Sequence, residues 1–173
     1  MGEISGLKLS PPTPITGDHE VKDFDSGEVS LDHWLQKRAL KNEAAGASRC
    51  FVVCAGSTVI GYYSLSAGAI SHAAAPQAMR RNMPDPLPVL LLGRLAIDRR
   101  YHNQGLGRAL LRDATLRAVS AAAGAGVFAI MVHALSDQAK RFYLSRGFVE
   151  SPLQEMTLFM TLATVRRILT EPG

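Results

Sequence analysis

The stretch "VLLLGRLAIDRRYHNQGLGRALLRDA", residues 89 to 114, decides the fold of this chain. Its first part, up to Asp98, is almost continuously apolar, a pattern typical of a β-strand that is buried on both faces. Apolar residues then recur at helical spacing after the two glycines of "NQGLG": Leu106, Ala109, Leu110 and Ala114. The stretch predicts a buried strand, a short connection and a helix that ends near Gly124.

The two glycines at the start of this helix, Gly105 and Gly107, have three possible purposes: a tight turn, close packing, or binding of an anion. A helix N-terminus exposes unpaired N–H groups and about half a positive charge, so it attracts phosphate where side chains do not block the approach. Glycines remove those side chains, and Arg108 and Arg112 add positive charge nearby. The pattern alone leaves all three interpretations open.

Two common phosphate-binding motifs are excluded. A nucleotide P-loop needs Lys and then Ser or Thr after its last glycine, but Arg108 and Ala109 follow here. A dinucleotide fingerprint needs a third glycine, where this chain has Leu110, and an acidic residue about 20 residues further on, where none occurs.

The segments before residue 89 predict a helix and a hairpin. Ser30 is the expected N-cap of a helix that places Leu31, Trp34, Leu35 and Ala39 on one face and ends at Gly46. Residues 50 to 55 and 58 to 68 are β-branched and aromatic runs separated by Gly56 and Ser57, which indicates a hairpin. The proline-rich segment 76 to 88 is expected to be turns, and Gly93 predicts a bulge or a close backbone approach in the buried strand.

The segments after the glycine-rich helix predict two more strands and a short helix. The strands are residues 127 to 135 and 155 to 162, and the helix between them is capped by Ser136 and ends at Gly147. The order β-β-β-α-β-α-β, after an initial helix, predicts an α/β (α+β) fold with a mixed central sheet and helices on both faces. We expect one domain over residues 1 to 173, with irregular tails at 1 to 17 and 164 to 173.

Composition excludes several classes of protein. With 47% hydrophobic and 20% charged residues, the chain is typical of an ordinary folded protein rather than a disordered one. No run approaches the roughly 18 apolar residues of a membrane span, and no signal architecture is visible, so we expect a cytoplasmic protein without membrane contact. Cys50 and Cys54 have no second Cys or His pair nearby, so we expect two reduced core thiols and no metal site. The net charge of +4 hints at a polyanionic partner.

The motifs together resemble the GNAT acetyltransferases. The resemblance lies in a buried strand interrupted by Gly93, "QGLG" leading into a helix, and a later A-x-x-F-Y-x-x-x-G-F pattern formed by Ala139, Phe142, Tyr143, Gly147 and Phe148. It implies the GNAT fold with a bulged strand at the cofactor site, and a glycine loop that holds the pyrophosphate of acetyl-CoA through backbone N–H groups. His102 stands where Gln or Arg is usual in that family. The implied acetyl-CoA contacts are Leu95, Ala96, Ile97, His102, Asn103, Gln104, Gly105, Leu106, Gly107, Arg108, Ser136, Ala139 and Phe142.

A narrower resemblance is to the acetyltransferase toxins of bacterial toxin–antitoxin pairs. It covers about residues 18 to 162 and rests on the following motifs: "LDHWL" (31 to 35), "GYYSLSAGAI" (61 to 70), "RRNMPDPLPV" (80 to 89), "LGRLAID" (92 to 98), "MVHALSDQAKRFY" (131 to 143) and "GF" (147 to 148). The resemblance implies transfer of acetyl to the free α-amino group of aminoacyl-tRNA, which stops translation. It also implies a homodimer and a ribbon-helix-helix antitoxin as partner.

The implied reaction needs an oxyanion donor, an acid and a base. Gly93 would free backbone N–H groups around Arg94 and Leu95 for the oxyanion, although close packing of this glycine is an equal alternative. Tyr143 is the implied general acid, because a phenol with a pKa of ~10 can protonate the leaving thiolate. No base is identified: His133, on a buried strand, is expected to be a hydrogen-bonded core histidine. An α-amino group, with a pKa near ~8, is partly neutral without a base.

Particular basic residues are the candidates for binding a polyanionic partner. Six of them would contact tRNA phosphates, and the alternative for each is a solvated surface: Lys37, Arg38, Lys41, Arg80, Arg81 and Arg94.

Two other functions are compatible with all or part of the evidence for an acetyl-CoA site. One is a GNAT acetyltransferase of protein N-termini or small-molecule amines, and the other is a non-catalytic acyl-CoA or nucleic-acid binding module.

Overall fold

The computed structural model describes residues 3–4 and 7–172. Residues 1–2, 5–6 and 173, which belong to the two predicted irregular tails, lie outside the described residues. The strands are β1 (Glu3–Ile4), β2 (Leu7–Lys8), β3 (Thr13–Pro14), β4 (Arg49–Ala55), β5 (Thr58–Ile70), β6 (Leu87–Ile97), β7 (Ala129–His133), β8 (Val149–Glu150) and β9 (Thr157–Thr161). The helices are α1 (Val29–Lys37), α2 (Ala39–Ala45), α3 (Gln77–Arg80), α4 (Leu106–Ala122), α5 (Asp137–Ser145) and α6 (Leu162–Thr170), with 3₁₀ turns η1 (His72–Ala74) and η2 (Arg99–Tyr101).

The main sheet is mixed, as the sequence predicted. Its strand order is β3-β4-β5-β6-β7-β9-β8, and β1 pairs separately with β2. The β4–β5 hairpin and the β7–β9 and β8–β9 pairs are antiparallel, whereas β6 and β7 are parallel. The parallel pairing ends with Leu92 opposite Val132, one residue before Gly93. A bulge at Gly93 itself stays a prediction.

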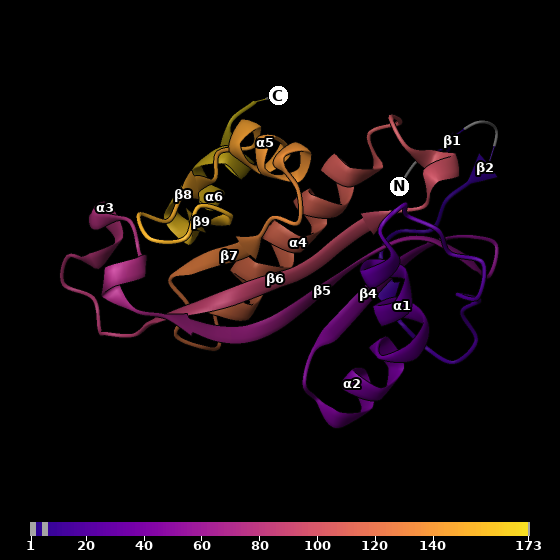
Figure 1. Ribbon diagram of the computed structural model, residues 1–173, viewed down its shortest axis with the longest axis horizontal. Coiled ribbons are helices and arrows are strands. Elements are labelled where there is room, and N and C mark those ends of the chain that lie inside the picture. The colour runs from indigo at the N-terminus through magenta and orange to yellow at the C-terminus, as the bar shows by residue number, and fades with distance from the viewer. Residues whose placement is uncertain (1–2, 5–6, 173) are drawn as a thin grey trace. The chain divides into compact units, whose positions relative to one another are not determined.

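The chain divides into two compact units. Unit 1 comprises the chain up to Ser66 together with Gly93–Ala114, and unit 2 comprises Ala67–Leu92 and everything from Thr115 onward. Three elements, which Figure 1 labels β5, β6 and α4, each contain a boundary between the units. The expectation of one domain stays a prediction, and each unit is described by itself.

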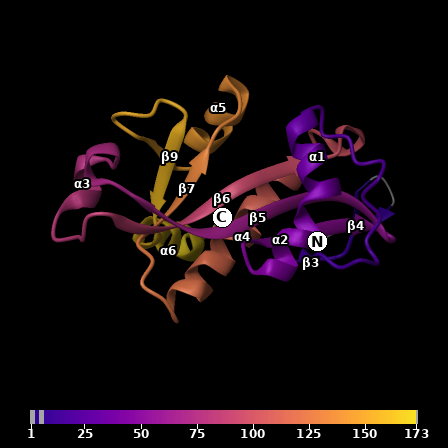
Figure 2. The same ribbon diagram turned by 60° about the horizontal axis from the view of Figure 1, so that its bottom comes forward.

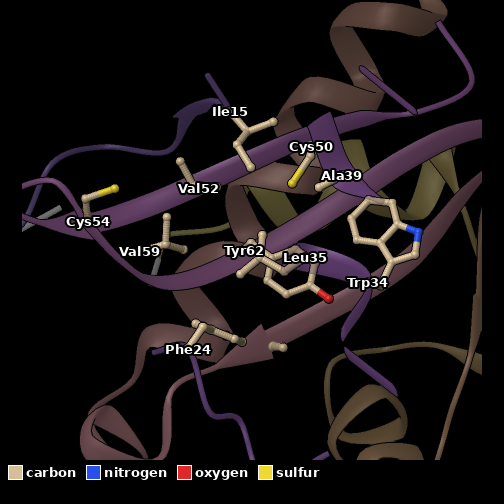
Figure 3. Close-up of a cluster of buried hydrophobic side chains, with 11 residues drawn as sticks. Ile15, Phe24, Trp34, Leu35, Ala39, Cys50, Val52, Cys54, Val59 and Tyr62 are labelled. Atoms are coloured by element: carbon tan, nitrogen blue, oxygen red, sulfur yellow. The ribbon is translucent and has the colours of Figure 1, made fainter. Parts of the chain in front are cut away.

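The core of unit 1 lies between the first two helices and the β4–β5 hairpin, whose ribbons run beside one another in both views (Figures 1 and 2). Alternate residues of β4 face this core, since side chains in a strand point to opposite faces in turn. Trp34 and Leu35 of α1 pack there against Tyr62 of β5 (Figure 3). The other members of the cluster are Ile15, Phe24, Ala39, Cys50, Val52, Cys54, Val59 and Ala96.

The predicted first helix differs in two ways from the observed one. It is interrupted at Arg38, so that α1 and α2 are separate helices, although α2 ends at Gly46 as predicted. Ser30 is not the N-cap, because α1 begins one residue earlier, after Glu28. Asp32 stabilises the start instead: its carboxylate accepts hydrogen bonds from the backbone N–H and the hydroxyl of Ser26, at 2.9 and 2.6 Å.

The core of unit 2 is formed by β7 and β9 with the segment that connects β5 to β6. Met131 lies opposite Phe159 in the antiparallel register, and both are buried. Apolar residues of η1 and α3, among them Ala75 and Met79, belong to the same cluster. The proline-rich segment 76 to 88 is therefore not only turns, since α3 and the start of β6 lie within it.

The prediction of an irregular tail from residue 164 is wrong as far as Thr170. The helix α6 occupies this segment because Thr161 caps it, accepting a hydrogen bond from the N–H of Thr164 at 3.1 Å, and because Leu162 and Val165 bury an apolar face. In the N-terminal tail, Thr13 and Pro14 form β3 against β4. Among the described residues, no helix combines the length and the apolar character needed to cross a membrane.

Replacing Leu35 by Ala tests the core of unit 1. Leu35 is 2% exposed, so the substitution removes buried methyl groups and leaves a cavity, and we expect it to lower the free energy of unfolding by about 2–5 kcal/mol. The control is Leu40→Ala on the neighbouring helix, where the side chain is 43% exposed and the expected loss is within about 0.5 kcal/mol. Urea unfolding measures both, and equal losses would contradict the assignment of Leu35 to the core.

Candidate active site

A loop of defined geometry connects β6 to α4 in unit 1. It consists of Asp98, the turn η2 and residues 102 to 105. Two of its residues lie in the left-handed region, Asn103 with φ 61° and Gly105 with φ 80°. Asparagine tolerates this region and glycine favours it, which explains both residue types at these positions.

Asp98 fixes the start of the loop. Its side chain is buried, and its carboxylate accepts hydrogen bonds from the N–H of Asp25 (3.2 Å), the N–H of Arg100 (3.0 Å) and the guanidinium of Arg100 (2.9 Å). The N–H of Asp98 donates to the carbonyl of Ile60 on β5 at 2.9 Å. Burial by itself raises the pKa of this carboxyl, but the hydrogen bonds from Arg100 and Asp25 outweigh it and hold the pKa below its usual value. This role of Asp98 was not predicted from the sequence, although its position at the end of an apolar strand pattern is visible there.

His102 stabilises the same loop through its ring. The Nε2 atom lies 2.7 Å from the carbonyl oxygen of Ile97, and because a carbonyl only accepts, Nε2 carries the proton and donates it. The ring is therefore bound to the backbone at the end of β6. A contact of His102 with the cofactor stays a prediction, but its side chain already has a structural role.

The first turn of α4 leaves backbone donors at the surface. The first hydrogen bond of the helix runs from the N–H of Ala109 to the carbonyl of Gly105, at 3.1 Å. An α-helix leaves its first N–H groups without partners inside the helix, here up to that of Arg108. Leu106 is 3% exposed and holds the helix start against the core, whereas Gly105 and Arg108 are exposed.

The open face of this turn fits a diphosphate. A Cβ atom at Gly105 would meet no atom within 4 Å other than those of its chain neighbours, so among the described residues the space directly beside this glycine is open. The positive end of the helix dipole and Arg108 both favour an anion there. The residues present therefore fit the pyrophosphate of acetyl-CoA, and its binding at this loop stays a prediction.

Gly61 on β5 allows α4 to pack closely, a role that the sequence analysis missed. A Cβ atom at this position would lie 2.9 Å from Ile97 Cδ1 and 3.2 Å from Leu110 Cδ1. Glycine therefore lets β5, β6 and α4 meet without displacing the ends of these two side chains. A glycine inside a strand pattern is the sequence signal of such a close backbone approach.

The predicted acid, Tyr143, lies on α5 in unit 2. Ser136 caps this helix as predicted, accepting a hydrogen bond from the N–H of Ala139 at 3.1 Å. Gly147, with φ 103°, ends it in a Schellman arrangement: the N–H of Phe148 donates to the carbonyl of Tyr143 and that of Gly147 to Leu144. Both ends of the helix are therefore fixed by the residues that the sequence analysis named.

The phenol ring of Tyr143 is buried between two other aromatic rings. Phe142 and Phe148 contact it edge-on, with ring centroids at 5.2 and 5.4 Å. Burial raises the pKa of Tyr143 well above its usual value, so the hydroxyl stays protonated throughout the neutral range. No described residue forms a hydrogen bond with this hydroxyl, which leaves its proton available to a ligand.

The other predicted cofactor contacts lie in two groups. Leu95, Ala96 and Ile97 form the end of β6 in unit 1, where the side chain of Ala96 is buried and only its backbone can face a ligand. Ala139 and Phe142 are half-buried residues of α5, after the cap Ser136. Their contacts with acetyl-CoA stay predictions, as do those of Asn103, Gln104 and Gly107.

Arg94 is held by an aromatic stack in unit 1. Its guanidinium carbon lies 4.3 Å from the centre of the Trp34 ring, and Trp34 stacks on Tyr62 with centroids 5.8 Å apart and an interplanar angle of 10°. Arg94 is half-buried, and burial lowers the pKa of its guanidinium. No described residue forms a hydrogen bond or an ion pair with Arg94. Its charge is thus oriented by the ring and free to bind an anion.

The remaining predicted tRNA contacts are less defined. Lys37, Arg38 and Lys41 are exposed at the junction of α1 and α2 in unit 1. In unit 2, Arg80 donates from Nε to the carbonyl of Ala75 at 2.9 Å, and Arg81 is exposed. The structure therefore gives a fixed orientation to Arg94 and Arg80 only.

Cys50 and Cys54 are buried free thiols, as predicted. Burial raises the pKa of Cys50 to about 12, so this thiol stays protonated. Within the described ranges, 3–4 and 7–172, no cluster of His, Cys, Asp and Glu has the arrangement of a metal site.

Comparisons with known proteins identify the family. The sequence matches the acetyltransferase (GNAT) domain over residues 46–150, which is more than half of the chain. This chain belongs to the GNAT acetyltransferase family. The GNAT fold and the acetyltransferase class expected from the glycine loop and from the A-x-x-F-Y motif are thus confirmed.

Relatives of this GNAT domain match it over nearly its full length. The tRNA-acetylating toxin of Mycobacterium tuberculosis is 48% identical over 160 residues, which cover 92% of this chain and 96% of the relative. A solved structure of AtaT complexed with acetyl-methionyl-tRNAfMet is 29% identical, with a TM-score of 0.87, and the match covers 94% of this chain and 100% of that one. A mutant AtaT toxin bound to the C-terminus of the antitoxin AtaR and to acetyl-CoA is 28% identical, with a TM-score of 0.82 and coverage of 94% and 99%.

Replacing Asp98 by Asn tests the anchoring of the glycine loop. Because the pKa of Asp98 is depressed in the folded state, its contribution to stability is present above the unfolded-state pKa of ~3.9 and is lost as the pH falls through the folded-state value. We therefore expect Asp98→Asn to lower the free energy of unfolding by about 2 kcal/mol at pH 7, and by much less at about pH 3. Urea unfolding at both pH values measures the difference, with the exposed Asp18→Asn as control. Equal losses at both pH values would show that the Asp98 charge does not stabilise the loop.

Proposed function

We propose that this GNAT domain is a toxin N-acetyltransferase that transfers acetyl from acetyl-CoA to the α-amino group of aminoacyl-tRNA and so blocks translation. The observation that carries the proposal is the 48% identity, over 92% of this chain, to a tRNA-acetylating toxin. The AtaT structure with acetyl-methionyl-tRNAfMet supports the same substrate class. A relative at this identity and coverage favours the same reaction more strongly than the alternatives of a small amine or a protein N-terminus.

The glycine loop binds acetyl-CoA in this proposal. The N–H groups at the start of α4 and the charge of Arg108 hold the diphosphate, and Asp98 and His102 keep the loop in shape. Bound in this way, acetyl-CoA supplies the acetyl thioester, an electrophile for an amine. The backbone at Leu95–Ile97 and the residues Ser136, Ala139 and Phe142 are the further proposed contacts.

Tyr143 is the general acid. Its buried phenol keeps its proton at neutral pH and gives it to the departing thiolate, after which exchange with solvent restores the phenol. The attacking group is the α-amine, which at a pKa near ~8 is partly neutral at physiological pH, unlike a lysine side chain at ~10.4.

The basic residues bind the acceptor end of the tRNA through its phosphates. Arg94, fixed over Trp34, gives the best-oriented charge, and Lys37, Arg38, Lys41, Arg80 and Arg81 add further positive charge. Because such contacts release counterions, the affinity for tRNA falls with rising salt and depends little on sequence.

The proposal includes a protein partner. Since a mutant AtaT toxin is bound to the C-terminus of its antitoxin AtaR, we infer that an antitoxin also binds this chain. The ribbon-helix-helix fold of that antitoxin, a homodimeric state and a cytoplasmic location are parts of the proposal that the family resemblance suggests.

A transfer assay with labelled acetyl-CoA and total charged tRNA tests the proposed reaction. We expect label on aminoacyl-tRNA and none on deacylated tRNA. Tyr143→Phe should lower the rate about 100-fold or more, because the phenolic proton is lost while the ring packing is kept. Tyr101→Phe, a half-buried tyrosine of η2, is the matched control and should keep the wild-type rate. Label on ribosomal protein or on small amines instead would overturn the choice of substrate.

Replacing Gly105 by Ala tests the binding of the cofactor. A residue with a side chain is strained at φ 80° by about 1–2 kcal/mol, so the first turn of α4 should shift and its N–H groups should lose their alignment. We expect calorimetry with desulfo-CoA to give an affinity about tenfold lower. Gly126→Ala, at a glycine where a Cβ would also meet nothing within 4 Å, is the control and should bind normally. Unchanged binding by a folded Gly105→Ala variant would rule out the diphosphate site.

A further inference from the structure

His133 is the last residue of β7 and the exposed one in that strand, whose four preceding residues are all buried. The expectation of a core histidine is therefore wrong, because the strand reaches the surface at this position. The function proposed above gives His133 no role. It is a titratable side chain at the carboxyl end of a central strand, directly before the segment that leads to Tyr143.

A chain of two hydrogen bonds fixes the tautomer of His133. Its Nδ1 atom lies 2.8 Å from the hydroxyl of Thr157, the residue opposite it on β9. The Thr157 hydroxyl in turn donates to the Oε1 atom of Gln154 at 2.9 Å. A hydroxyl has one proton, and Gln Oε1 only accepts, so the Thr157 oxygen has to accept from the Nδ1–H of His133.

This arrangement leaves the Nε2 atom of the neutral ring with a lone pair and without a proton. The support beneath it is rigid: Thr157 is 4% exposed, and its N–H donates to the carbonyl of Gln154 at 3.0 Å. A histidine whose Nδ1–H is bound by a fixed acceptor is oriented to accept protons at Nε2. The geometry is that of a general base held by a neutral partner.

The chain connects His133 closely to the proposed acid. After β7, the N–H of Ala134 donates to the carbonyl of Met156 at 2.8 Å, and Ser136 then caps α5, which carries Tyr143. The proton acceptor and the proton donor thus belong to one strand–helix unit, β7–α5, within unit 2 (Figure 1).

Three charged groups on the neighbouring segments of unit 2 lie together. Lys140 of α5 lies 2.7 Å from Glu150 of β8 and 3.9 Å from Glu155 in the loop before β9. No carboxylate among the described residues forms an ion pair with His133. Thr157 is therefore the group that sets the orientation of its ring.

We propose that His133 is the general base of the acetyl transfer, accepting at Nε2 the proton that the attacking α-amine loses. The inference rests on the proposed function. As the new C–N bond forms and the C–S bond breaks, the nitrogen gives its proton to His133 and the sulfur takes the phenolic proton of Tyr143. Exchange with solvent then returns both residues to their starting states, so no net proton is gained or lost.

The first test is the pH profile of kcat/KM for His133→Gln with aminoacyl-tRNA as substrate. In the wild type, the amine and His133 both have to be deprotonated, so log(kcat/KM) should rise at low pH with a slope of about two; the variant should lose one ionisation and rise with a slope of about one. We expect kcat to fall about 100-fold near pH 7, with unchanged binding of desulfo-CoA. His33→Gln, at an exposed histidine of α1, should keep the wild-type profile.

A second pair of variants changes the partner of the ring. Thr157→Val keeps the shape of the buried side chain but removes the acceptor, so kcat should fall about tenfold with little change in KM, whereas Thr157→Ser should restore it. Nitrogen-15 NMR of the free protein should find the Nδ1–H tautomer for His133, and a mixture of tautomers in Thr157→Val. If His133→Gln does not fold, these variants decide the question.

The outcomes separate this inference from the proposed function. If the wild type does not acetylate aminoacyl-tRNA, the proposed function fails. If the wild type does so and folded His133→Gln keeps both its rate and a slope of about two, His133 is not the base although the function stands. An Nε2–H tautomer in the free protein, or a full rate in Thr157→Val, would also overturn the inference.

Discussion

The site depends on the unpaired N–H groups at the start of α4, which are useful only if the loop before them is rigid. The chain achieves this with two groups before the helix, the buried carboxylate of Asp98 and the ring of His102, and with the side chain of the first helical residue, Leu106. The Asp98 carboxylate and the His102 ring bind backbone groups, and Leu106 is buried in the core. The glycines leave the donors accessible, and these neighbours keep the donors in place, so preorganisation and access are provided by different residues.

Most of the fold could be predicted because its signals are local. The β-branched and aromatic runs of the β4–β5 hairpin, the cap at Ser136 and the end of α5 at Gly147 each need only a few neighbouring residues, and all are observed. The failures depend on contacts distant in sequence or on burial of a face. For α6, the cap at Thr161 and the burial of Leu162 and Val165 form a helix in a segment that was expected to be irregular.

The sequence predicted those parts of the site whose chemistry follows from the residue type. Glycines before a helix and a tyrosine on the following helix have recognisable patterns, and family resemblance gave them roles. Partners distant in the sequence have no such pattern: Asp98 meets Asp25, Arg94 meets Trp34, and nothing near His133 in the sequence indicates Thr157. These pairs determine the protonation and the orientation of the side chains in the site. The electrostatics of the site could therefore not be predicted from the sequence alone.

The two compact units are each assembled from separate parts of the chain, which has a consequence for synthesis on the ribosome. Unit 1 lacks the start of α4 until the segment up to Ala114 has emerged, and unit 2 lacks β9 until almost the whole chain is made. No early nascent fragment contains both the glycine loop and Tyr143. An enzyme that arrests protein synthesis would thus gain its reactive groups only when its own translation is nearly finished.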